Sequence, residues 1–427
     1  MMRTFVSLFK NKEIRNKIFF TLAMLLIYRV GSAIPVPNVD ATSLASQIAD
    51  NSILNMMNLL GGGALERLSI FAMGVTPYIT ASIIIQLLSM DVIPALTEMT
   101  KSGQTGRRKM EKITRYLGVV LSFVQAYSLV YGFDKQYGIL ENANISGYLY
   151  TATVLTAGTM FLIWIGDRIS MKGIGNGLSI IIFGGIVANI PTSFTQVYQV
   201  LIGGTSSGEV FNGVLQFALY VLMYLAIIVF VVIMETAVRK IPIQYTNSST
   251  TRGGSDVTYL PLKINSASVI PVIFAQSIMT APQIVISFFN TDLYNQLQSW
   301  LSLTSWTGLG LYAVLTILFT FFYTDLQVDP DQMADNLSKS GAYIPGIRPG
   351  SETKTYLHKV LNRITVLGAL ALTFVAVIPY LLPMVTSLPN SISIGGTGII
   401  IVVGVAKETM AQLKGQLTQK QYHGFLK

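Results

Sequence analysis

The sequence contains no cysteine and only two histidines, His358 and His423, both outside its apolar runs. Without cysteine there can be no disulfide, and the usual ligands of haem, zinc and iron–sulfur clusters are missing from those runs. The sequence also has neither a Walker phosphate-binding loop nor a dinucleotide-binding glycine pattern. We therefore expect no cofactor, no metal and no enzymatic activity, so that any energy source must lie outside this chain.

Charge is also scarce, because charged residues make up 11% of the 427 residues while hydrophobic residues make up 51%. This balance is typical of a protein with many membrane spans. The sequence therefore predicts an all-α polytopic membrane protein. Its ten apolar segments cover residues 18–35, 71–90, 116–133, 149–166, 176–190, 213–234, 266–289, 308–324, 364–382 and 392–406.

The basic residues assign an orientation to these segments. If the amino terminus lies inside, only Arg67 and Lys135 of the 29 Lys+Arg fall outside, and Arg29 falls within the first segment. Inside loops of membrane proteins carry such an excess of Lys and Arg. The first segment follows a basic start and lacks a small-residue cleavage pattern, so we expect a first span and not a cleaved signal. Both termini are predicted to be cytoplasmic, in a multi-pass protein of the cell membrane.

A long outer connection, around residues 193–212, follows the fifth span and divides the spans into two sets of five. Because five is odd, the second half must run in inverted topology relative to the first, as is common in transport proteins. We expect an N-terminal half at residues 1–190, an external connection at 191–212, a C-terminal half at 213–410 and a cytoplasmic tail at 411–427.

The second apolar segment is interrupted by Gly74 and Pro77. Thr76 followed by Pro77 is typical of a helix start, with a hydroxyl cap and then a residue whose missing N–H costs nothing. The remaining residues, 77–90, would span only about 21 Å of a core of about 30 Å. Irregular backbone at membrane depth is tolerated only inside the protein or along a cavity, so this stretch is expected to face a pore or a site.

A second interrupted span supports that location. The glycines at 61–63 predict a hinge before the broken span, and Leu65 and Leu68 follow on one side of a short amphipathic turn. The seventh segment is interrupted as well, by Pro271 and Pro282. Disrupted segments at matching places in inverted halves indicate the functional site. Spans 2 and 7 are therefore expected to face each other there.

Two cytoplasmic loops have distinctive sequences. Residues 235–265 contain two alternating runs around Arg252, which predict a protruding hairpin. Residues 325–363 carry GAYIPGIRPG, a turn made rigid by proline and glycine that presents Arg348. These loops suggest docking surfaces, whereas the shorter basic loop GRRKMEK is equally well explained by the positive-inside rule alone.

Several long motifs occur in a recognisable order: TPYITASIIIQLL, SGQTGRRKMEKITRY, GIGNGLSIIIFGGIVANIP, LPLKINSASVIPVIFA and ADNLSKSGAYIPGIRPG. On these motifs the sequence resembles the SecY family, the channel subunits of the bacterial Sec protein translocase. The resemblance implies a clamshell of two inverted five-helix halves with a pore between them. It also implies a lateral gate between spans 2 and 7, and a plug helix at about residues 55–72 that closes the outer funnel. The plug residues implied are Gly61, Gly62, Gly63, Ala64, Leu65, Glu66, Arg67 and Leu68.

The resemblance also implies a hydrophobic constriction ring in the pore. Carried over by motif, the ring consists of Val75, Ile79, Ile182, Ile273 and Ile401. β-Branched side chains are stiff, and a narrow ring without hydrogen-bonding atoms resists wetting and hence ions. Taken singly, each of these residues is an ordinary core or lipid-facing residue, and only the resemblance assigns it to a ring.

Further roles follow from the same resemblance. Gln86 and Gln276 lie on the two gate helices, where they could form a hydrogen bond across the closed gate. SecA or the ribosome would dock on the basic loops. The docking residues implied are Arg252, Arg348, Arg107 and Arg108. The partners implied are SecE and SecG in a heterotrimer, the SecA ATPase, the ribosome, preproteins with their signal peptides, and membrane lipid.

These features favour a passive channel that passes unfolded preproteins through the ring and releases apolar segments sideways between spans 2 and 7. An ion-coupled secondary transporter is the main alternative, and a ribosome receptor without a pore is a third. A coupled transporter normally keeps carboxylates or histidines deep in its spans, but Asp167, Glu235 and Asp325 all lie at span ends. In the ninth segment, Leu372 is expected to face lipid.

Overall fold

The structure is a computed structural model. It describes residues 11–39, 58, 61–89, 92–140, 143–203, 210–245, 258–287, 300–303, 305–385 and 396–424. Within these residues one helix corresponds to each of the ten predicted apolar segments. In chain order they are α2 (Lys12–Ser32), α5 (Thr76–Leu88), α7 (Gly103–Tyr137), α8 (Ile145–Lys172), α9 (Gly177–Tyr198), α10 (Val210–Thr236), α11 (Ile270–Ser287), α13 (Trp306–Gln327), α15 (Ser351–Val385) and α16 (Gly396–Gly424).

Six of the helices in the described part of the chain are long and apolar enough to cross a membrane. They correspond to α7, α8, α9, α10, α13 and α15. The span of α9 continues to Gly203, and that of α13 continues to Lys339. The two interrupted spans form shorter apolar helices, Thr76–Leu88 in α5 and Ile270–Met279 in α11. The 13 residues of α5 rise only about 20 Å, so the prediction that span 2 is too short to cross alone is confirmed.

The start of α5 differs from the prediction by one residue. Thr76 was expected to cap the helix, but it is the first helical residue, and the cap position is occupied by Val75 without a side-chain hydrogen bond. Pro77 lies in the first turn, where its missing N–H has no intrahelical partner to lose. The proline therefore fixes the start of α5, as expected.

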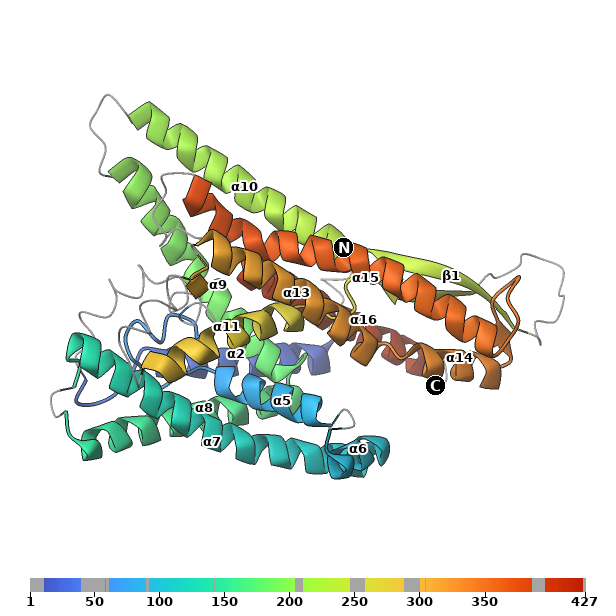
Figure 1. The fold of residues 1–427 in the computed structure, drawn as a ribbon, viewed down its shortest axis with the longest axis horizontal. Helices are drawn as coiled ribbons and strands as arrows, with labels where there is room; N and C mark the ends of the chain where they lie inside the picture. The colour runs from blue at the N-terminus through green and yellow to red at the C-terminus, as the bar shows by residue number, and fades with distance from the viewer. Residues whose placement is uncertain are drawn as a thin grey trace.

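The helices pack as two sets with the same neighbour relations. In the first set α5 packs on α7 and α7 on α8, and in the second set α11 packs on α13 and α13 on α15. Figure 1 shows α5, α7 and α8 along the lower side of the molecule, and α10 and α15 along the upper side. The two sets meet where α9 packs on α16 and α11 approaches α7. This arrangement is the one expected of two five-helix halves.

A large apolar core lies in the second half. It joins α10, α11, α13, α15 and α16 through buried side chains that include Val231, Val272 and Tyr312. Leu372 of α15 belongs to this core and is fully buried, so the expectation that it faces lipid is wrong. The exposed side of α15 instead carries Leu370, which is 56% exposed.

The two long loops that are predicted to be cytoplasmic form a single unit. β1 (Val238–Tyr245) pairs antiparallel with β2 (Thr258–Lys263), which confirms the predicted hairpin. β3 (Ala342–Tyr343), from the other loop, pairs with the opposite edge of β1, so the strand order is β2-β1-β3. Helix α14 (Pro330–Lys339) and the first turns of α15 cover this sheet with a small apolar core. Figure 1 shows β1 and α14 at the same end of the molecule as α6 (Pro94–Lys101).

Candidate functional site

The five residues of the predicted ring lie in one apolar cluster, which we call the central cluster. Four of them, Val75, Ile182, Ile273 and Ile401, are at most 9% exposed, and Ile79 is partly buried against the same cluster. They come from the start of α5, from α9, from α11 and from α16. The cluster therefore lies where the two halves meet, and it brings together residues that are far apart in the sequence.

The residues before α5 also pack against the central cluster. Ala64 and Phe71 are members of it, while Leu65 and Leu68 are fully buried against the helix pair α7 and α8. We call residues 61–75 the plug segment. One apolar side of the plug segment therefore contacts the central cluster, and the other contacts α7 and α8.

The plug segment consists of successive turns and contains no regular helix. Gly62, Gly63 and Gly74 have positive φ, and Leu68 has a φ of 39°. Left-handed residues at these positions interrupt the i to i−4 hydrogen bonds that a helix requires. The expected plug helix is thus replaced by a compact turn structure over the described residues, and positions 55–57, 59 and 60 lie outside them. The Glu66 backbone N–H donates a hydrogen bond to the Asn58 Oδ1 at 3.0 Å. The side chain of Arg67 is exposed.

A second apolar cluster joins the two halves between α5 and α11, and we call it the gate seam. Ile83 of α5, Phe274 of α11 and Tyr323 of α13 are buried in it. The Phe274 ring lies 4.9 Å from that of Phe319 and 5.4 Å from that of Tyr323, centroid to centroid. Separating these apolar contacts would break no covalent bond and no ion pair.

The two glutamines predicted for the gate have different surroundings. Gln86 is exposed on α5, and its Oε1 accepts a hydrogen bond from the Tyr323 hydroxyl at 3.3 Å. Gln276 is 6% exposed on α11. The structure therefore brings Gln86 to α13, the neighbour of α11, and the residue that sequence reasoning missed here is Tyr323.

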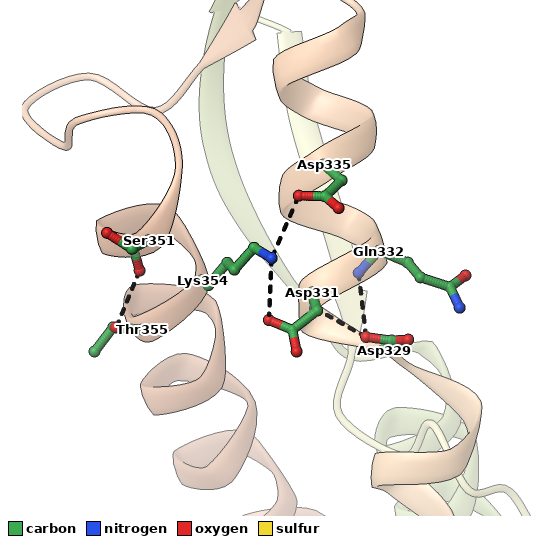
Figure 2. A network of polar contacts seen from close by, with 7 residues as sticks. All are labelled: Asp329, Asp331, Gln332, Asp335, Ser351, Lys354 and Thr355. Carbon is green, nitrogen blue, oxygen red and sulfur yellow. Dashed lines mark hydrogen bonds and ion pairs between the residues drawn. The ribbon is translucent and has the colours of Figure 1, made fainter.

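The predicted docking arginines that the structure describes are on the surface. Arg107 and Arg108 are exposed near the beginning of α7, and Arg348 is exposed in the turn between β3 and α15. Arg252 lies outside the described residues. Lys354, in the first turns of α15, forms ion pairs with two carboxylates of α14, Asp331 at 3.8 Å and Asp335 at 3.4 Å (Figure 2).

Carboxylates at the helix ends have structural partners. Asp167 of α8 pairs with Arg115 of α7 at 2.8 Å. Glu235, buried at the end of α10, accepts a hydrogen bond from Asn265 Nδ2 at 2.7 Å and lies 4.0 Å from Lys407 Nζ. Both carboxylates lie at helix ends and are held by neighbouring side chains, which disfavours them as the ion-coupling sites that a secondary transporter needs.

Comparison with known proteins assigns this arrangement to a family. The SecY family model matches residues 69–410. The protein translocase subunit SecY of Bacillus subtilis (strain 168) is 46% identical over 432 residues, covering 100% of both chains. That of Staphylococcus aureus (strain NCTC 8325 / PS 47) is 46% identical over 430 residues, covering 100% of this chain and 99% of the relative.

Solved structures agree on the fold. One described as the structure of a protein conducting channel superposes with a TM-score of 0.64 at 20% identity, covering 93% of this chain and 91% of the other. Sec61 in the canine ribosome-channel complex from the endoplasmic reticulum gives a TM-score of 0.61 at 19% identity, with the same coverage. The match to the family model and to full-length relatives, together with this fold, therefore defines a helical, protein-conducting channel of a membrane. The chain belongs to the SecY family, whose members form the channel of the protein translocase.

Proposed function

We propose that unfolded polypeptide crosses the membrane through the central cluster, with Val75, Ile79, Ile182, Ile273 and Ile401 as its constriction. The observation that carries this proposal is that residues from both halves converge in one apolar cluster at the seam between them. Apolar, β-branched side chains exclude water and ions at rest, yet they make no hydrogen bonds that a sliding chain would have to break.

The plug segment is the proposed seal of this path. Ala64 and Phe71 pack into the central cluster, and the turns that contain the plug glycines are short and irregular enough to move as a unit. The gate seam is the proposed lateral exit, since its apolar contacts between α5, α11 and α13 can be replaced by contacts with lipid or with an apolar segment of the substrate.

The channel is proposed to lie in the plasma membrane. Both termini and the unit of β1, β2, β3 and α14 are proposed to lie on its cytoplasmic side. The positive-inside distribution supports it. We propose that SecA or the ribosome docks on Arg107, Arg108, Arg252 and Arg348, as basic loops suit ribosomal RNA phosphates, and that SecE and SecG complete a heterotrimer. The channel would supply no chemistry of its own.

The two proposed halves are residues 1–190 and residues 213–410, and residues 191–212 connect them. Helix α9 continues through part of this connection, as far as Tyr198.

A cysteine crosslink tests the proposed path. The chain has no native cysteine, so Ile273→Cys provides a single thiol, and a second cysteine is placed in the middle of a secretory protein stalled during transport. We expect a disulfide only while the substrate is stalled, since Ile273 would line the path. Leu370→Cys, on the exposed side of α15, is the control and should remain unlinked.

Two results would contradict the proposed path. Crosslinking at Leu370→Cys as strong as at Ile273→Cys would show that the contact is not specific to the centre. The absence of any crosslink at Ile273→Cys, together with flux of a small solute down its gradient, would favour the secondary transporter instead.

The gate seam makes a separate prediction. Phe274→Ala should leave a cavity in the seam and let it separate more readily, so that secretory proteins with defective signal peptides are exported about tenfold better. Export of such a protein is measured in cells. Phe230→Ala on α10 is the matched control, because that ring is 39% exposed and pairs with Phe374 away from the seam. An equal gain in the control, or a loss of export for all proteins, would argue against the gate.

A further inference from the structure

Two side chains of α2 hold the backbone of the glycine hinge. The Tyr28 hydroxyl donates a hydrogen bond to the Gly61 carbonyl at 3.0 Å, and Arg29 donates from a guanidinium nitrogen to the Gly62 carbonyl at 2.7 Å. Tyr28 is buried and also belongs to the central cluster. A cation inside a predicted membrane span is costly unless it is paired or reaches an interface, and here it pairs with a backbone acceptor.

The hinge is also fitted closely against α9. A side chain at Gly62 would collide with the Tyr28 hydroxyl and lie 2.9 Å from the Gly185 Cα, and one at Gly63 would lie 3.0 Å from the Asn189 Oδ1. Gly62 and Gly63 have φ values of 71° and 80°, which glycine alone adopts readily. The hinge is therefore clamped between α2 and α9.

The far end of the plug segment is held by the same helix and by the residues that follow it. The Phe71 ring packs directly on Gly31 of α2, leaving no room there for a side chain. Val36 N–H donates to the Leu68 carbonyl at 3.0 Å, and Ile70 N–H donates to the Ile34 carbonyl at 3.0 Å. Span 1 and the residues that follow it thus contact the plug segment both at its hinge and near its far end.

We propose that Tyr28 and Arg29 are positioning residues that latch the plug hinge to span 1 and so set how readily the resting channel opens. The inference rests on the proposed role of residues 61–75 as the seal. Moving the plug segment outward must break both side-chain hydrogen bonds, and the bond from Arg29 is charge-assisted and hence the stronger. Arg29 would then keep the channel closed without touching the transported chain.

The test compares four channels in proteoliposomes, each as the full chain assembled with its membrane partners. They are the native channel, Arg29→Met, a channel lacking residues 62–70, and the combination. Potassium efflux is measured without substrate. We expect Arg29→Met to raise efflux roughly tenfold, because methionine keeps the length of the side chain but donates no hydrogen bond. In the channel lacking the plug residues, Arg29→Met should have no further effect.

Each other outcome overturns a specific claim. If deleting residues 62–70 leaves efflux unchanged, the proposed seal fails and the latch fails with it. If the deletion leaks but Arg29→Met does not, the latch alone fails. If Arg29→Met adds an equal leak to the deleted channel, Arg29 acts elsewhere. Arg15→Met, an exposed position on the same helix, is the matched control and should match the native channel.

A second measurement does not depend on conductance. Ala64→Cys is a small change at a fully buried plug position, and its modification by a membrane-impermeant maleimide from outside reports displacement of the plug. Arg29→Met should speed this labelling roughly tenfold, Tyr28→Phe should speed it less, and Arg29→Lys should restore part of the protection. Equal labelling rates in all of these channels, with normal assembly, would overturn the latch.

Discussion

Replacing Ile79, Ile182 and Ile273 together by serine should raise the resting ion leak of the channel roughly a hundredfold. Each replacement exchanges a buried or, at Ile79, partly buried apolar side chain for a small hydroxyl and removes roughly 2 kcal/mol of resistance to wetting. A change of 2 kcal/mol corresponds to a factor of about 30 in the leak. The effects of the three replacements will not add fully, because all three act on one constriction. Potassium efflux from proteoliposomes measures the leak.

The control for this prediction uses the same chemistry on an outer surface. Leu215, Leu219 and Leu222 of α10 are 50, 57 and 66% exposed, and leucine has the same atoms as isoleucine. Their combined replacement by serine should leave the leak unchanged. If the ring variant folds and assembles correctly but does not leak, the central cluster is not the constriction. If the α10 variant leaks equally, the leak comes from a general loss of packing in the protein.

Hydropathy was sufficient to predict where the helices lie. A membrane span is recognised by a long apolar run, which needs no knowledge of neighbouring elements. Each predicted segment accordingly corresponds to a helix of the described chain. The break before α5 was also predictable, because Gly74 and Pro77 act locally on the backbone.

What could not be predicted depends on contacts between distant parts of the chain. α15 is apolar around most of its circumference where it crosses the membrane, so its sequence did not reveal that Leu372 faces the core and Leu370 does not. The pairing of β3 with β1 joins loops separated by about a hundred residues. The partner of Arg29 is a backbone carbonyl 33 positions away, and a carbonyl has no signature in the sequence.

The central cluster shows the same limit. Isoleucines are abundant in this chain, and nothing local distinguishes Ile182 or Ile401 from isoleucines in the lipid-facing or core surfaces. The family resemblance selected the five ring positions, and the fold brings them into one cluster. Local physics therefore predicted the spans, whereas the location of the centre required the resemblance.

On the proposed docking of SecA, Arg348→Glu should reduce SecA-driven transport of a preprotein into vesicles about a hundredfold and leave the resting leak unchanged. Arg348 is exposed in a turn whose backbone is fixed by other groups: the Thr353 hydroxyl donates to the Arg348 carbonyl at 2.9 Å, and neighbouring Ile344 is buried. The ion pairs of Lys354 hold α14 beside α15 (Figure 2). The substitution therefore reverses the presented charge while the turn persists, and reversal of an interfacial charge costs a complex roughly 3 kcal/mol.

The matched control is Lys359→Glu, which makes the same change of charge at an exposed position farther along α15. It alters the net charge of this region as much as Arg348→Glu does, so it separates a specific contact from a general electrostatic attraction. Transport by the Lys359→Glu channel should remain within about twofold of native, because a rim charge outside a contact contributes little. If both variants lose transport equally, the basic surface attracts its partner as a whole and Arg348 is no specific docking residue; if neither loses it, the partner binds elsewhere on the channel.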